Sequence, residues 1–137
     1  MASRSLDDLR SVMQIRAKAW QAACHAAGLD VLVYCTFRSP EEQDDLYARG
    51  RSRPGKIVTN ARGTPPQSAH NVGLALDFVP LVGGKALWKA PSPEWLEAVE
   101  IAGNCGLESG SSWPKLKDWP HLQMPGWKDY ATGPLGG

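Results

Sequence analysis

The stretch SAHNVGLALDFVPL, residues 68–81, decides how this 137-residue chain is built. Its second half, LALDFVPL, is an apolar run that predicts a buried strand, and it contains one carboxylate, Asp77. Gly73 stands just before the strand and permits a bend or a close backbone approach, with His70 on the far side of that bend. The stretch therefore predicts a turn and a strand that bring a histidine and an aspartate together.

The flanking segments predict the other elements. Ser5 and Asp8 resemble a capping box, and apolar residues then recur at helical spacing until Gly28 supplies a stop. The segment Ser39–Gly50 opens with a serine cap and a proline and closes with a glycine, which predicts a second helix. The remaining elements expected are strands at 29–37, 74–81, 85–89 and 121–124 and a third helix at 93–104.

Short strands in an irregular order predict an α+β fold: a small, mainly antiparallel sheet with about three packed helices and a metal site in a surface cleft. The length is that of one ordinary domain, and the chain has neither repeats nor linkers, so residues 1–137 are expected to form a single domain. A formal net charge of +1 argues against nucleic acid or acidic membranes as partners. The N-terminus lacks a signal-peptide pattern, and no window is long enough to span a bilayer, which predicts synthesis in the cytosol.

The segment 50–67 is dense in Gly, Pro, Arg and Asn and predicts a long surface loop that ends near the first histidine of interest. A small basic cluster lies in or beside it, and its two interpretations are a solvated loop and a contact for an anionic polymer. The cluster consists of Arg49, Arg51, Arg53 and Lys56.

The cysteines predict neither a disulfide framework nor a thiolate metal site. Cys24, Cys35 and Cys105 are widely spaced and form no C-x-x-C pair. The expected helix contains Cys24 and the expected strand contains Cys35, so both are interpreted as reduced core thiols.

A second pair of polar residues, Asp118 and His121, precedes and begins the last strand. His70, Asp77 and His121 together offer two imidazoles and one carboxylate, a ligand set that leaves one position open, as in catalytic zinc sites. We expect one Zn²⁺ per chain with water in the fourth position, and Asp118 as a general base beside that water, which predicts amide hydrolysis. In the alternative interpretation Asp77 caps a turn, Asp118 is a solvated loop residue and the histidines are ordinary core or surface residues.

These residues resemble the M15 group of zinc peptidases that cut bacterial cell-wall peptides. The group's signature, S-x-H-x-x-G-x-A-x-D, is matched by Ser68, His70, Gly73, Ala75 and Asp77. Its later acidic residue three positions before a histidine corresponds to Asp118 and His121, and its upstream arginine element resembles TFRSPEEQDDLYARG, with Arg38 and Gln43. The resemblance spans roughly residues 28–127.

The resemblance implies a role for each matched residue. By it, His70, Asp77 and His121 are the zinc ligands and Asp118 is the catalytic acid/base. Arg38 is catalytic, Ser68 and Gln43 bind substrate, and Arg38 and Ser68 contact substrate or stabilise developing negative charge. One departure is Ser109 in GLESGSSW, where relatives carry an aromatic residue, and it changes the expected wall of the substrate pocket.

Within the group the chain is most similar to phage endolysins of the L-alanyl-D-glutamate endopeptidase type. The resemblance implies a monomer that acts on the peptidoglycan stem peptide, waits in the host cytoplasm for holin-type release, and then reaches the periplasm and cell wall. Two alternatives stay open at this point. One is a D,D-carboxypeptidase or D-alanyl-D-alanine dipeptidase of the same family, in which Arg38 would clamp a terminal carboxylate. The other is a non-catalytic wall-binding module, against which Asp118 argues.

Overall fold

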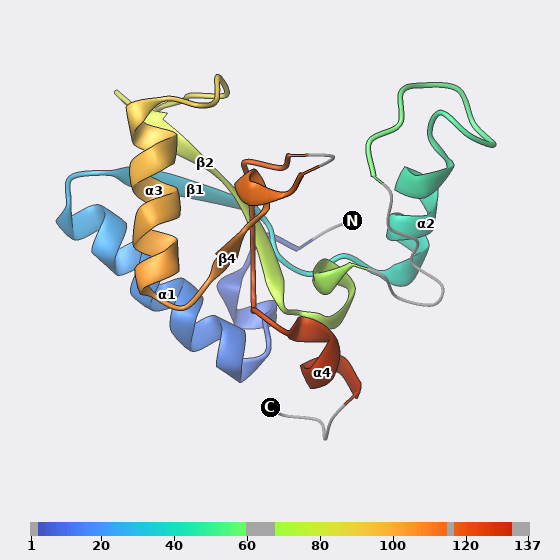
Figure 1. The fold of residues 1–137 in the computed structure, drawn as a ribbon, viewed down its shortest axis with the longest axis horizontal. Helices are drawn as coiled ribbons and strands as arrows, with labels where there is room; N and C mark the ends of the chain where they lie inside the picture. The colour runs from blue at the N-terminus through green and yellow to red at the C-terminus, as the bar shows by residue number, and fades with distance from the viewer. Residues whose placement is uncertain (1–2, 60–67, 115–116, 133–137) are drawn as a thin grey trace.

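The structure is a computed structural model that describes residues 3–59, 68–114 and 117–132 (Figure 1). Its helices are α1 (Ser11–Ala26), α2 (Pro40–Ala48), α3 (Pro93–Asn104) and α4 (Trp127–Thr132). Its strands are β1 (Asp30–Cys35), β2 (Ala75–Val82), β3 (Lys85–Ala86), β4 (Glu108–Ser109) and β5 (His121–Gln123). Three short 3₁₀ helices are η1 (Leu6–Asp8), η2 (Ala69–Val72) and η3 (Gly110–Ser112).

The strands form one antiparallel sheet in the order β1-β2-β5-β4, and β3 extends it by pairing with the end of β2 as a hairpin. β2 is therefore a central strand, and its residues from Ala75 to Pro80 are buried. The predicted α+β class with a mainly antiparallel sheet is confirmed.

Helices α1 and α3 pack on one face of the sheet (Figure 1). The Phe78 ring of β2 meets Trp20 of α1 and Trp95 of α3, at centroid separations of 4.9 and 5.0 Å. The Trp20 indole also donates to the Ala98 carbonyl at 3.0 Å, which ties the two helices together. Because neighbouring residues of a strand point to opposite faces, Asp77 points away from these helices.

The first helix differs from its prediction. Ser5 caps only the three-residue η1, Leu9 is extended (φ −84°, ψ 153°), and α1 begins at Ser11. The Arg10 backbone N–H donates to the Gly73 carbonyl at 3.0 Å, so the break docks the chain onto the turn before β2. The predicted single helix was therefore wrong at its start, because a tertiary contact outweighs local helical spacing.

The other predictions hold within a few residues. α2 begins with a full capping box between Ser39 and Glu42, and α3 begins and ends where the sequence predicts. The short β4 and α4 were not predicted. Of the predicted loop at 50–67, residues 51–59 contain no helix or longer strand, and 60–67 lie outside the described residues. Among the helices described, none has the length and apolar character needed to cross a membrane.

Candidate metal centre

The face of the sheet opposite α1 and α3 carries the histidines and the aspartate. In the pairing of β2 with β5, Asp77 lies directly opposite His121. Gly73 (φ 71°) ends η2 in a left-handed conformation, and this turn returns the chain so that His70 faces Asp77. His70 Nε2 lies 3.1 Å and His121 Nδ1 lies 3.5 Å from Asp77 Oδ1. The structure thus brings the three predicted ligand residues together in buried positions.

Each histidine is oriented by an acceptor on its other ring nitrogen. His70 Nδ1 donates to the Thr36 carbonyl at 2.8 Å, and His121 Nε2 donates to Gln123 Oε1 at 2.7 Å. In the neutral imidazoles these bonds leave the lone pairs of His70 Nε2 and His121 Nδ1 directed at Asp77 Oδ1.

Three acceptor atoms that converge in this way call for a cation. Ligands about 2.0–2.1 Å from a tetrahedral ion are separated by about 3.3 Å, which agrees with the two observed separations. Without an ion a proton takes that place: burial disfavours charge on His70, but the Asp77 carboxylate outweighs it and raises the pKa of His70 to about 10. The residues present fit a single small divalent cation with nitrogen and oxygen ligands.

Asp118 approaches this centre through a tight turn. The His121 N–H donates to the Asp118 carbonyl at 3.2 Å, and the Asp118 N–H donates to the Gly110 carbonyl at 2.9 Å. Potential ligand atoms of Asp77, Asp118 and His121 lie within 4.8 Å of one another. Burial, followed by the charge of Asp77, raises the pKa of Asp118, which favours a group that takes up and releases protons.

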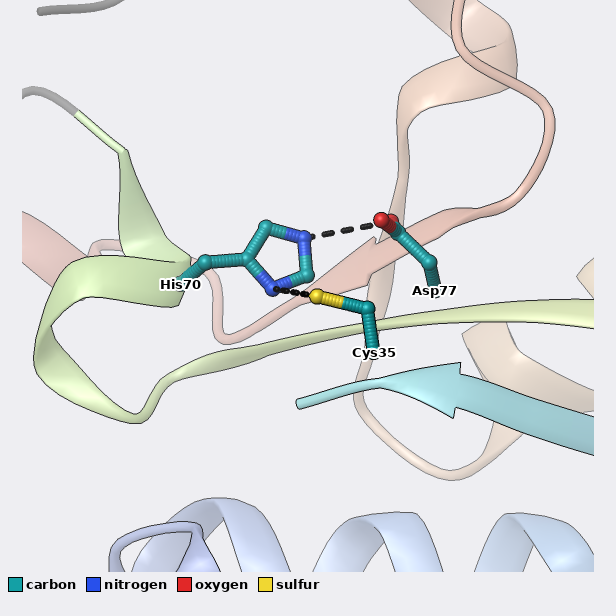
Figure 2. A group of neighbouring side chains, drawn as sticks. All are labelled: Cys35, His70 and Asp77. Atoms are coloured by element: carbon teal, nitrogen blue, oxygen red, sulfur yellow. Dashed lines mark hydrogen bonds and ion pairs between the residues drawn. The ribbon is translucent and has the colours of Figure 1, made fainter. Parts of the chain in front are cut away.

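Cys35 and Arg38 are further neighbours of the His70 and Asp77 pair. Figure 2 shows the His70 ring between Asp77, toward which Nε2 points, and Cys35, whose sulfur lies 3.8 Å from Nδ1. Arg38 Nη2 donates to the Cys35 sulfur at 3.5 Å and lies 3.6 Å from Asp77 Oδ2. The guanidinium therefore neutralises the outer oxygen of the carboxylate whose inner oxygen faces the histidines.

Two predicted substrate contacts have partners within the protein. Gln43 is 1% exposed and accepts from Arg38 Nη1 at 2.9 Å, so it holds the arginine in place. The Ser68 hydroxyl caps η2 by accepting from the His70 N–H at 3.3 Å, while Ser68 also lines the cleft. Their contacts with substrate stay predictions.

The centre opens into a cleft of about 690 Å³. Its polar lining includes Arg38, Arg49, Asp118 and Lys128, and Trp113 stacks at a tilt on His121 with ring centroids 4.9 Å apart. Sequence reasoning did not single out Trp113, which follows the irregular GLESGSS segment. The Ser109 hydroxyl, at the position of the expected aromatic, caps η3 by accepting from the Ser111 N–H at 3.1 Å.

Fold and site together define a hydrolase-like centre for one cation, and comparison with known proteins identifies its family. A family profile described as D-alanyl-D-alanine carboxypeptidase matches residues 62–124. The peptidoglycan L-alanyl-D-glutamate endopeptidase CwlK of Bacillus subtilis (strain 168) is 42% identical over 125 residues, which cover 85% of this chain and 74% of CwlK. The chain belongs to the M15 family of peptidases, which are generally metal-dependent.

Further relatives agree. The L-alanyl-D-glutamate peptidase of Listeria phage A118 is 34% identical over 110 residues, which cover 80% of this chain but only 35% of the phage protein. Among solved structures, the L-Ala D-Glu endopeptidase ChiX of Serratia marcescens matches with a TM-score of 0.68 at 20% identity, over 95% of this chain and 92% of ChiX. The LD-carboxypeptidase LdcB matches with a TM-score of 0.67 at 19% identity, over 90% of this chain and 62% of LdcB. These structures share the fold.

Proposed function

We propose that this chain is a zinc-dependent peptidoglycan peptidase that hydrolyses the L-Ala–D-Glu bond of the stem peptide. The observation that carries the proposal is the convergence of His70, Asp77 and His121 on one point, with the Asp118 carboxylate beside it in an open cleft. The choice of bond is supported by the names of two relatives, at 42% and 34% identity.

In this proposal His70 Nε2, Asp77 Oδ1 and His121 Nδ1 would hold one Zn²⁺ per chain. Zinc in such a site supplies a Lewis acid for the substrate carbonyl and a water whose pKa is about 7. Asp118 accepts a proton from the attacking water on its carboxylate and returns it to the amine as the amide C–N bond breaks. Arg38 fixes Asp77 and presents positive charge to the cleft, where negative charge develops on the carbonyl oxygen.

The charges of the cleft suit a glutamate-containing substrate. A glutamate in a peptide chain uses one carboxyl group in the chain and keeps the other as a free carboxylate. Arg49 and Lys128 are exposed residues that line the cleft and offer positive charge to it. The free carboxylate of such a substrate can therefore pair with a positively charged side chain of the cleft.

The second candidate function is a carboxypeptidase or a D-alanyl-D-alanine dipeptidase, which the description of the matching family profile favours. Such an enzyme must clamp a terminal carboxylate. The fork of Arg38 contacts Asp77, Gln43 and Cys35, so its N–H groups are engaged inside the protein, and it offers the cleft positive charge rather than a two-point clamp. We therefore favour the endopeptidase.

The biological setting is part of the proposal. We infer a phage endolysin that acts as a monomer, with residues 1–137 forming one domain, and that stays in the host cytoplasm until holin-type release brings it to the cell wall. A phage relative supports this setting. The charged and buried neighbourhood of Asp118 argues against a non-catalytic wall-binding module, which has no need of a base at that point.

Mass spectrometry of purified peptidoglycan after digestion tests the proposal. We expect peptides with a new N-terminal D-glutamate, and glycan that retains L-alanine. Release of free D-alanine or of D-alanyl-D-alanine would establish the carboxypeptidase or dipeptidase instead. Unchanged peptidoglycan in the presence of added zinc would refute a peptidase function.

A further inference from the structure

Two of the three ligand residues, Asp77 and His121, belong to a four-residue arrangement on the sheet. β2 and β5 pair so that Asp77 lies opposite His121 and Ala75 lies opposite Gln123. Residues two apart on a strand point to the same face, so all four side chains share the face that carries the centre. Ala75 and Gln123 have no role in the mechanism described so far.

Gln123 lies against His121 and is almost as well buried. The two residues are 8% and 4% exposed, and His121 Nε2 donates to Gln123 Oε1 at 2.7 Å. Ala75, opposite Gln123, is fully buried and ends at its methyl group. A larger side chain at position 75 would compete for the space beside the Gln123 amide, which gives the alanine of the signature a physical reason.

The direction of this hydrogen bond matters for the centre. An amide oxygen only accepts, so the proton is on Nε2 and the neutral His121 keeps an unprotonated Nδ1. That Nδ1 is the atom 3.5 Å from Asp77 Oδ1. In the opposite tautomer an N–H would point at the centre, where a cation needs a lone pair.

We propose that Gln123 is a positioning residue, which holds His121 as the Nε2–H tautomer and thereby presents Nδ1 to the metal. The proposal rests on the proposed metal site but not on which bond is cut. Gln123 would act on His121 as the Thr36 carbonyl acts on His70, whose Nδ1 donates to that carbonyl at 2.8 Å. The difference is that a side-chain acceptor can be replaced by mutation.

The tautomer can be read in the unaltered protein by nitrogen-15 NMR of the histidine ring. In the zinc-loaded protein we expect the proton of His121 on Nε2 and none on Nδ1. A proton on Nδ1 would overturn the proposal. This measurement needs neither a variant nor an active enzyme.

Zinc affinity, measured by chelator competition, tests the role of the amide oxygen. Gln123→Met keeps the length of the side chain but removes the acceptor, and we expect zinc affinity to fall about 10- to 100-fold, as is typical when an outer contact of a metal ligand is lost. Gln123→Glu keeps an acceptor and should hold zinc at least as tightly as the parent protein. The absorption spectrum of the cobalt(II) form should change in the Met variant and be preserved in the Glu variant.

A matched control lies on α1, away from the centre. Gln21 is an exposed glutamine of that helix, and Gln21→Met should leave zinc affinity within twofold. Equal affinity in the parent and Gln123→Met proteins, or equal losses in the Met and Glu variants, would refute the positioning role. Failure of the peptidase proposal looks different, because it would appear as intact peptidoglycan or as an absence of zinc binding in the parent protein.

Discussion

Cys35 lies directly opposite Asp77 in the pairing of β1 with β2, although Val33, two residues earlier, lies opposite the next residue, Phe78. One extra residue, Tyr34, is therefore accommodated in β1 as a β-bulge. Asp77 and Phe78 point to opposite faces of β2, so the bulge directs Cys35 to the site face while Val33 stays in the core. The bulge thus gives Arg38 a sulfur acceptor beside His70.

Arg38→Lys tests whether the shape of the guanidinium matters. Arg38 reaches Asp77, Gln43 and Cys35 at once, and a lysine ammonium on one stem does not reproduce that fork. We expect turnover on cell-wall fragments to fall about 10- to 100-fold, since charge-assisted hydrogen bonds contribute about 1.5–3 kcal/mol, while zinc content stays unchanged. Arg53→Lys is the control, because Arg53 pairs with Asp45 at the surface. Near-normal turnover of Arg38→Lys would reduce Arg38 to a packing role.

His70→Ala tests the metal site itself. Removing one of three ligand side chains should lower zinc affinity by more than the roughly 100-fold attributed to outer contacts, and lysis should be abolished. Metal analysis after gel filtration and a turbidity assay on cells measure the two effects. His25→Ala is the matched control, because His25 is exposed at the end of α1 and faces Asp30. A fully zinc-loaded, active His70→Ala protein would exclude His70 as a ligand.

The residues of the centre were predictable because their chemistry is visible in the sequence. The caps at Ser39 and Ser92 likewise place two helices, because a serine followed by a proline is a local signal. Asp118 could be placed beside His121 from their separation of three residues alone, and a tight turn joins them.

The remaining features depend on contacts between distant segments. Strict alternation along β1 places Cys35 on the core face with Val33, and only the bulge reverses it, so a core role for Cys35 was the natural interpretation. The role proposed for Gln123 depends on the register in which β5 pairs with β2, and that register cannot be read from the sequence. β4 is two residues long, too short for any periodicity to reveal it.

Gly110→Ala tests how closely the loop before Asp118 is packed. A methyl group at Gly110 would lie 2.5 Å from the Asp118 carbonyl oxygen and 3.2 Å from His121 Cβ, so the backbone must shift. We expect a loss of stability of about 1–3 kcal/mol, as for overpacked sites, together with a fall in turnover. Gly103→Ala in α3 is the control: nothing lies within 4 Å, and alanine in a helix should stabilise by about 0.5–1 kcal/mol. Urea unfolding of both variants measures the difference, and an unperturbed Gly110→Ala protein would contradict the close packing.

The metal-free protein should lose stability between neutral and alkaline pH. The pKa of His70 is about 10 in the folded protein against 6.5 ordinarily, so its ion pair with Asp77 stabilises fully below pH 6.5 and is lost as the pH rises toward 10. Burial opposes the charged form of Asp77, but His70 and His121 hold its pKa far below the usual range, so the same pair also weakens as the pH falls below about 4. Melting temperatures of chelator-treated protein from pH 4 to 10 measure this pH dependence. In His70→Ala the melting temperature should fall less between neutral and alkaline pH than in the parent protein. An identical fall of the melting temperature at alkaline pH in the two proteins would show that the ion pair of His70 with Asp77 does not contribute to stability.

Asp118→Asn separates proton transfer from metal binding. The amide keeps the shape of the side chain and its place in the turn before His121, but it cannot accept the proton of the attacking water. Proton transfer by a positioned group is worth about 10²- to 10⁴-fold in rate, so turnover should fall by that order while zinc stays near one per chain. Both quantities must be measured on the same sample. Loss of zinc together with activity would make Asp118 a ligand and force Asp77 or one histidine out of the proposed set, whereas unchanged turnover would remove Asp118 from the chemistry.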